Sequence, residues 1–252
     1  MDGAAARTPR LPQLDERLQT AYALVPHCAL CADIGADHGR LIARLLADGR
    51  AERALVSDIS ADALDKARRR LQRLHLADRA TFARADGFEA LDVLPDGRAD
   101  VACVLGMGGD TIARMLLAGR ERLSGATLVL GAQTLLPTVR RAVADVGYAL
   151  AEERLALASG RIYTLMRCVP AAPGARAPDE RTLFAGLAPV GRDEPLRERW
   201  LSRRLALAQT AAKRMESADR RKDDERLALT RREIACLTEA LELERKERGE
   251  GV

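Results

Sequence analysis

Three aspartates stand at the ends of three apolar runs, where they could bind a polar ligand together. Asp33 closes the first run, Asp58 lies 25 residues further on, and Asp86 ends the next run. If these runs are parallel strands, their ends meet at one edge of a sheet, where open α/β proteins bind ligands. A carboxylate there can accept both hydroxyls of a ribose, which suits Asp58 with Ile59 beside it. Asp86 is placed to accept from the amino group of a base, and Gly87 leaves room for that base.

Each aspartate alone would also fit a helix N-cap or a turn. The turn after Asp33 adds further candidates. Gly35 lets the chain turn tightly, and the amides that open the next helix offer donors and a positive dipole end to a carboxylate or phosphate. Asp37 and His38 lie in this turn, and we expect them to hold the ligand and to line a reaction pocket. A structural role for His38, in bonding the loop backbone, stays open.

A glycine cluster follows another apolar run. Gly106, Met107, Gly108 and Gly109 come directly after Leu105. Glycines expose backbone, so a flat base could lie against this run at the place where a group is transferred. Gly106, Met107 and Gly108 are therefore candidate catalytic residues, and Gly106 is also expected to touch the ligand. A tight turn into the next helix would need only one glycine.

These residues need a sheet to position them. Predicted strands alternate with patterns of helical spacing, which requires a parallel sheet covered on both faces. The strands are predicted at residues 29–34, 53–57, 80–85, 101–105 and 127–130. Two further runs, 148–158 and 161–169, are joined only by Ser159 and Gly160, which indicates an antiparallel hairpin. This α/β layout, a mostly parallel Rossmann-like sheet closed by a hairpin, is that of class I S-adenosylmethionine-dependent methyltransferases.

The C-terminal part has a different character. We predict a methyltransferase domain over residues 1–170, a linker over 171–194, and a helical coiled-coil arm over 195–252. In the arm, apolar residues recur at heptad spacing in two stretches, which predicts an antiparallel helical hairpin. Residues 195–222 hold nine Lys or Arg against three Asp or Glu, whereas 223–248 hold six against eight. The basic stretch is either a solvated face or a contact for RNA phosphates through Arg203, Arg204, Lys213 and Arg214.

Composition excludes other classes of protein. The chain has 252 residues, of which 47% are hydrophobic, and no apolar run approaches the ~20 residues that a membrane span needs. The first twelve residues lack the apolar segment of a secretory signal, so we expect a cytoplasmic protein. The five cysteines are interpreted as reduced, buried thiols. Cys28 and Cys31 form a C-x-x-C pair, but no second pair completes a zinc site, so no metal is expected.

Together these residues resemble the TrmK family, the bacterial tRNA (adenine-22-N1)-methyltransferases. The similarity rests on the runs 33–38, 85–87, 106–109 and 161–163 and on the helical tail. It implies S-adenosylmethionine as cofactor, tRNA as partner and methyl transfer to adenine N1. It also places Arg17, in the predicted N-terminal helix, as an RNA contact. The sequence departs from the family pattern at two places, which bear on the substrate base and on the orientation of the arm. Gly131-Ala132-Gln133 lacks the usual Gln-Pro-Asn order, and residues 183–189 match only loosely the Phe-Gly-Pro-like sequence that leads into the tail.

Two alternatives remain. A methyltransferase for a small molecule or a protein would use the arm for dimerisation, and the sequence sets no oligomeric state. A non-catalytic RNA- or partner-binding relative would keep the fold without cofactor affinity.

Overall fold

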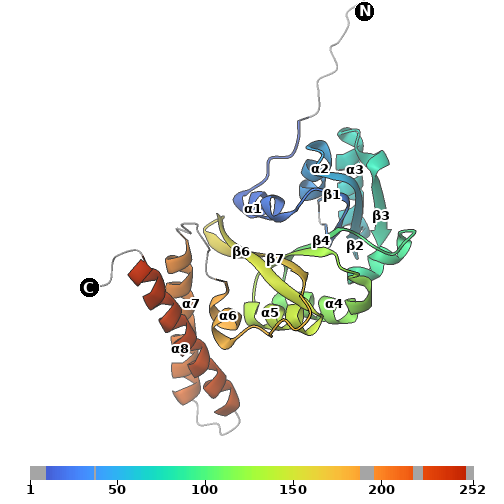
Figure 1. Ribbon diagram of the computed structural model, residues 1–252. Coiled ribbons are helices and arrows are strands. Elements are labelled where there is room, and N and C mark those ends of the chain that lie inside the picture. Colours follow the sequence, from blue (N-terminus) through green and yellow to red (C-terminus); the bar gives the residue numbers. More distant parts are fainter. Residues whose placement is uncertain (1–9, 37, 188–195, 218–223, 248–252) are drawn as a thin grey trace, which may run out of the picture.

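The computed structural model describes residues 10–36, 38–187, 196–217 and 224–247. Seven strands form one sheet in the order β3-β2-β1-β4-β5-β7-β6 (Figure 1). The pairings from β3 to β5 are parallel, and β7 is antiparallel to both of its neighbours. The strands are β1 (Cys28–Ile34), β2 (Ala51–Asp58), β3 (Ala80–Arg84), β4 (Val101–Met107), β5 (Thr127–Ala132), β6 (Tyr148–Ala158) and β7 (Arg161–Pro170). The predicted fold class is confirmed.

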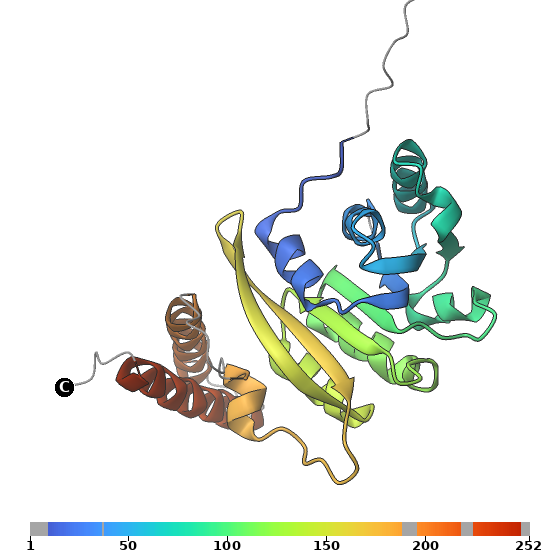
Figure 2. The same cartoon turned by 45° about the horizontal axis from the view of Figure 1, so that its top comes forward.

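Helices cover both faces of this sheet (Figure 2). Buried residues of α1, α2 and α3 form one cluster with residues of the strands, and those of α4 and α5 form a second cluster on the other face. Leu18 of α1 and Leu41 of α2 belong to the first, and Ile112 of α4 and Val139 of α5 to the second. The helices are α1 (Glu16–Leu24), α2 (Arg40–Ala47), α3 (Ala61–Arg73), α4 (Gly109–Ala118) and α5 (Leu136–Asp145), with short 3-10 turns η1 (Ala77–Arg79), η2 (Gly87–Val93) and η3 (Arg120–Arg122).

The hairpin β6–β7 forms where the sequence predicts it. Ser159 and Gly160 have φ values of 48° and 73°. Positive φ at both central residues of a two-residue connection follows the right-handed twist of the flanking strands. Because β7 is antiparallel to β5, the tip of this hairpin lies at the same edge of the sheet as the carboxyl ends of β1 to β5.

The predicted linker contains a helix. α6 (Glu180–Ala185) begins at Asp179, whose Oδ1 accepts from the Thr182 amide at 2.7 Å, and it buries Leu183 and Phe184. Its six residues are too few for a periodic pattern to reveal it. The structure leaves residues 188–195 of this segment undescribed, and the predicted domain boundaries stay a prediction.

Two helices form the arm, α7 (Arg197–Ser217) and α8 (Asp224–Glu247). Leu201, Ala208 and Ala212 of α7 and Leu237 and Leu241 of α8 are buried, as their heptad spacing predicts. These residues are not buried by contacts within the arm alone. α8 also packs against α6, and all of them except Ala212 belong to the same apolar cluster as buried residues of α4 and α5. Figure 1 shows the arm beside α6 and the hairpin.

Candidate active site

A cavity of about 570 Å³ lies at the carboxyl ends of the central strands. Its wall comes from the ends of β1, β2 and β4, the turns after β1 and β3, the residue after β5, and the helices α1, α2 and α4. Residues predicted to bind the ligand or to act in catalysis are brought together here: Asp33, Gly35, His38, Asp58, Ile59, Asp86, Gly87, Gly106 and Met107. The parallel strands place these side chains on one edge, as the alternating pattern requires.

The three aspartates differ in their surroundings. Asp33 is 4% exposed, at the end of β1. Asp58 accepts from the Ser60 amide at 2.8 Å through Oδ1, so one carboxylate oxygen also serves the turn before α3. Asp86 stands at the N-cap position of η2, and its side chain makes no capping hydrogen bond there. A structural task in the turn therefore accounts for part of the role of Asp58, whereas capping does not account for Asp86.

Gly35 is needed for close packing as well as for its turn. It has a φ of 71°, and a Cβ on it would lie 2.0 Å from Cε of Met107. Its amide and that of Ala36 donate to the Ser57 carbonyl at 2.8 and 2.9 Å, which ties the loop to β2. These two amides hold the loop in place, so they are engaged within the protein. His38 lines the cavity in this loop, and Asp37 lies outside the described residues.

The three glycines of the cluster have different backbone conformations and surroundings. β4 continues through Met107, and Gly106 has a φ of 80° with a Cβ position 3.1 Å from Nη1 of Arg17. Gly109 opens α4 where a Cβ would lie 2.2 Å from the Thr134 carbonyl oxygen. Gly108 has an extended backbone and room for a Cβ, and it is not part of the cavity wall. The structure therefore does not bring Gly108 to the cavity, and its catalytic role stays a prediction.

Three further residues of the cavity wall were not predicted as site residues from the sequence. Arg40, Gln133 and Met115 line the cavity, and none belongs to a motif that predicts this place. Gln133 directly follows β5, and its backbone amide donates to the Met107 carbonyl at 2.9 Å. The signal for Gln133 is its position after a strand, the same signal that singles out Asp58. Arg17, predicted to contact RNA, also lies in the cavity wall.

The four basic residues predicted for RNA binding lie on α7, and none lines the cavity. Arg203, Lys213 and Arg214 are exposed. Arg204 is different, because its Nη2 donates to Oε1 of Glu233 on α8 at 2.5 Å and its guanidinium lies 5.4 Å from the centre of the Trp200 ring. The role of Arg204 as a phosphate contact stays a prediction, although its guanidinium is engaged within the arm.

All five cysteines are free thiols, but only Cys31, Cys103 and Cys168 are buried; Cys28 and Cys236 are half-buried, so the prediction of burial is wrong for these two. Burial raises the pKa of the Cys168 thiol, and a hydrogen bond with Cys103 together with burial raises the pKa of Cys31. Both are therefore protonated thiols at neutral pH. Within the described ranges, no group of three or more His, Cys, Asp or Glu side chains is arranged to hold a metal ion. Across the same ranges, no helix is long and apolar enough to cross a membrane.

Residues 14–166 match the model of the methyltransferase domain family. The chain belongs to that family. A Bacillus subtilis protein named tRNA (adenine(22)-N(1))-methyltransferase is 30% identical over 155 residues, which are 61% of this chain and 64% of that protein. The match thus spans less than two thirds of that relative.

Solved structures extend the similarity to almost the whole chain. The crystal structure of the B. subtilis m1A22 tRNA methyltransferase TrmK has a TM-score of 0.77 at 24% identity, covering 92% of this chain and all of the other. The M. capricolum TrmK, in complex with S-adenosylhomocysteine, has a TM-score of 0.76 at 16% identity over 91% of this chain and 98% of the other. The resemblance to the TrmK family predicted from the sequence is confirmed, and the similarity of fold includes the C-terminal helices.

Proposed function

We propose that this protein transfers a methyl group from S-adenosylmethionine to N1 of an adenine in tRNA, at position 22. The observation that carries the proposal is the cavity, in which three aspartates from successive strand ends meet in a chain of the methyltransferase family. The name of the B. subtilis relative supports the substrate, and the complex of the M. capricolum protein supports the cofactor.

The residues of the cavity fit this cofactor. Its volume of about 570 Å³ lies within the ~300–1,000 Å³ range of small-molecule sites. Asp58 would accept from the ribose hydroxyls and Asp86 from the adenine amino group, with Gly87 and Ile59 against the base. When bound, the sulfonium supplies an electrophilic methyl carbon.

Catalysis by this chain would consist mainly of positioning. Adenine N1 carries an in-plane lone pair, so no strong base is needed, and the product base is cationic. Gly106 and Met107 would border the target base, and Asp37 and His38 would offer acceptors as positive charge develops. The exposed cations of α7 would hold the phosphates of the tRNA while the base leaves its stack. We assign methyl transfer to residues 1–170 and RNA contact to the arm, residues 195–252, and a tRNA substrate would place the protein in the cytoplasm.

The test is incubation of the protein with unmodified tRNA transcripts and labelled S-adenosylmethionine, followed by mapping of the methylated base. We expect label at one adenine and none in a matched transcript with guanine at position 22. Label in both transcripts at another base would contradict the position. A protein that binds S-adenosylhomocysteine but labels no tRNA would favour a small-molecule or protein substrate, and one without cofactor affinity would favour a non-catalytic binding role.

A further inference from the structure

Gln133 lines the cavity directly after β5. The residue is exposed, and its side-chain amide makes no hydrogen bond within the described parts of the chain. Its backbone is held in place, because its amide donates to the Met107 carbonyl at 2.9 Å and Met107 pairs with Ala132 in the sheet. A fixed backbone that carries an unpaired side-chain amide is the arrangement expected of a group that meets a ligand.

The side chain of Gln133 differs in chemistry from the other polar groups of the wall. The aspartates are carboxylates, which only accept hydrogen bonds, and Arg17 and Arg40 carry guanidiniums, which only donate. Among the described residues of the wall, Gln133 alone has a primary amide, which offers a donor and an acceptor side by side. It therefore suits a ligand edge that presents an acceptor beside a donor.

The order of the strands places Gln133 on the side of the target base. The cavity follows the ends of β2, β1 and β4, with the turn after β3 at one side and Gln133 after β5 at the other. In the proposed function, Asp86 takes the base of the cofactor and Asp58 takes its ribose. The transferred methyl group must then lie further along the edge, toward β4, and the acceptor of that group must lie beyond it, toward the end of β5.

Methyl transfer to N1 limits which edge of the target adenine the protein can hold. The lone pair of N1 forms the new N–C bond while the C–S bond breaks and leaves its electron pair on sulfur. No proton moves in this step, and a side chain that bound N1 would block it. The N6 amino group and N7 remain available, a donor beside an acceptor. A glutamine amide matches this pair with two hydrogen bonds, whereas guanine presents two acceptors at the same positions.

We propose that Gln133 selects adenine as the target base, with Oε1 accepting from the N6 amino group and Nε2 donating to N7. This inference rests on the proposed function and adds a specificity-determining residue to it. Gln133 acts on the choice of base and not on cofactor binding, because β1 and β4 separate it from Asp58 and Asp86 along the edge of the sheet.

The experiment is a double-mutant cycle between the protein and the RNA. tRNA is prepared with adenine or with 7-deazaadenine at position 22, and the analogue has C–H in place of N7 but keeps N1 and the amino group. For the wild type we expect kcat/KM to fall about 10-fold with the analogue, the effect of a donor left unpaired. Gln133→Ala should lower kcat/KM for the adenine substrate by about 10- to 100-fold and should then use the two RNAs within about twofold of each other.

A second variant and a control accompany this cycle. Gln133→Glu keeps the size of the side chain but has no donor for N7 when its carboxylate is ionised, so it should also lose the preference for adenine, and it serves where Gln133→Ala is too slow to compare. The matched control is Gln72→Ala, which removes an exposed amide from α3, outside the cavity wall. It should keep the wild-type kcat/KM and the preference for adenine. Calorimetry with S-adenosylhomocysteine should give affinities within about twofold for the wild type and all of these variants.

The outcomes separate this inference from the proposed function. A wild type that uses both RNAs equally, or Gln133 variants that keep the preference for adenine, would overturn the inference while methylation of tRNA still stands. A loss of affinity for S-adenosylhomocysteine in Gln133→Ala as large as its loss of kcat/KM would also overturn it, because Gln133 would then belong to the cofactor site. A wild-type protein that methylates neither RNA would instead overturn the proposed function, and with it the inference.

Discussion

Asp58 illustrates how one residue of this site has two tasks. Its Oδ1 accepts from the Ser60 amide, while the side chain lines the cavity. We predict that Asp58→Ala weakens binding of S-adenosylhomocysteine by about 2–3 kcal/mol, because the variant has no carboxylate to accept from the ribose hydroxyls. Calorimetry measures this.

The control for Asp58 is Ser60→Ala. Ser60 Oγ accepts from the Ala63 amide at 3.3 Å and caps α3, so removing it should lower the free energy of unfolding by about 1 kcal/mol without changing affinity. If a folded Asp58→Ala variant behaves like Ser60→Ala, Asp58 serves only the turn.

Neighbouring glycines provide a second test at this scale. We predict that Gly109→Ala lowers the free energy of unfolding by about 1–3 kcal/mol, because its Cβ would overlap the Thr134 carbonyl oxygen. Gly108→Ala should change the free energy of unfolding by less than about 0.5 kcal/mol, since its Cβ would be 3.6 Å from Thr134 Oγ1. Urea denaturation of the two variants compares them directly. A decrease for Gly109→Ala as small as that for Gly108→Ala would contradict the argument, because the loop at Thr134 would then move to make room for the Cβ.

At the scale of elements, a buried ion pair joins α5, β6 and α6. Arg140 and Glu153 have side chains 0% and 5% exposed, and their Nε and Oε1 atoms are 2.9 Å apart. Arg140 also donates to the Leu183 carbonyl at 2.6 Å, and Glu153 accepts from the Leu187 amide at 2.5 Å. The pair thus fixes the C-terminal end of α6 and the residues that follow it, and because α6 packs against α8 the pair also supports α8.

We predict that Glu153→Leu lowers the free energy of unfolding by about 3–5 kcal/mol, because it leaves the Arg140 cation buried without its carboxylate. The double variant Arg140→Met with Glu153→Leu should recover part of this decrease. Asp92→Asn is the control, since it removes the exposed pair with Arg122, in which N and O are 2.8 Å apart, and its effect should be far smaller. Thermal or urea unfolding measures all three, and a Glu153→Leu variant as stable as wild type would refute the argument.

The sequence could predict the strands and the cavity, because both follow from local patterns. Apolar runs that end in Asp33, Asp58 and Asp86 report strand ends, and parallel pairing brings strand ends together. It could not predict the burial of Arg140, because the groups that compensate its charge come from positions 13 and 43 residues away along the chain. The engagement of Arg204 within the arm could have been predicted, because Arg204 lies between the apolar heptad residues Leu201 and Leu205. A count of charges alone does not separate Arg204 from Arg203.

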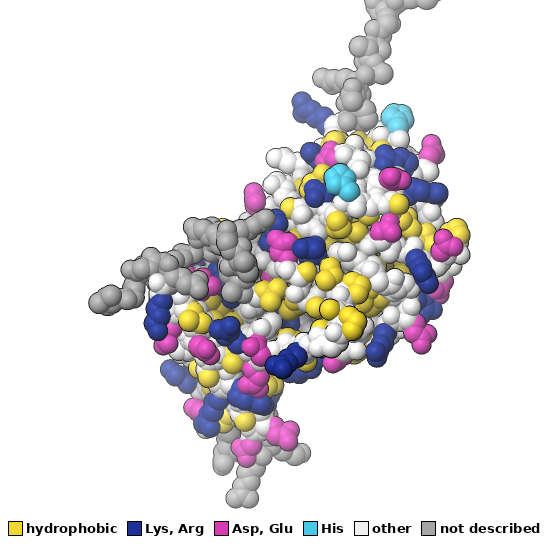
Figure 3. All heavy atoms as spheres, in the orientation of Figure 1, with side chains coloured by type: hydrophobic (Ala, Val, Ile, Leu, Met, Phe, Trp, Pro, Cys, Tyr) yellow, Lys and Arg dark blue, Asp and Glu magenta, His cyan; other side chains and the backbone are white. Residues whose placement is uncertain are grey.

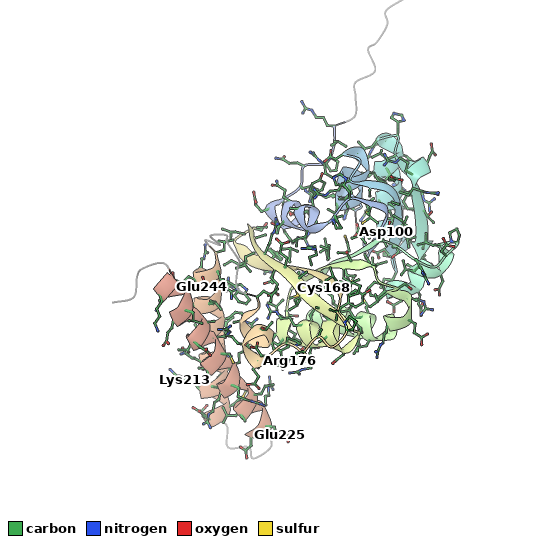
Figure 4. All side chains as sticks on the ribbon, viewed as in Figure 1. Asp100, Cys168, Arg176, Lys213, Glu225 and Glu244 are labelled. Atoms are coloured by element: carbon green, nitrogen blue, oxygen red, sulfur yellow. The ribbon has the colours of Figure 1, made fainter. Side chains whose placement is uncertain are left out.

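For the whole molecule, the arm has a defined direction relative to the sheet. Figure 4 places Glu244 at the end of the arm near the hairpin and Glu225 at the opposite end. Glu244 pairs with Arg197, their Oε1 and Nε atoms 2.5 Å apart, so α7 starts near the hairpin and runs away from it. On the face shown in Figure 3, basic and acidic side chains are interspersed over the arm. If the arm contacts RNA as proposed, that contact would depend on particular exposed cations rather than on a uniform field.

The last prediction separates these cations by their surroundings. Arg203, Lys213 and Arg214 are exposed on α7, whereas Arg204 is bound to Glu233. Exchange of the three exposed residues for Gln should weaken tRNA binding and reduce the slope of log affinity against log salt by roughly 0.7–0.9 for each phosphate that the variant no longer neutralises. Arg204→Gln removes the same charge, but we expect it to lower the stability of the arm and leave the slope unchanged. Filter binding across a salt series compares the wild type with both variants. If the triple variant keeps the wild-type slope, the arm does not touch the RNA backbone, and a role in dimerisation follows instead.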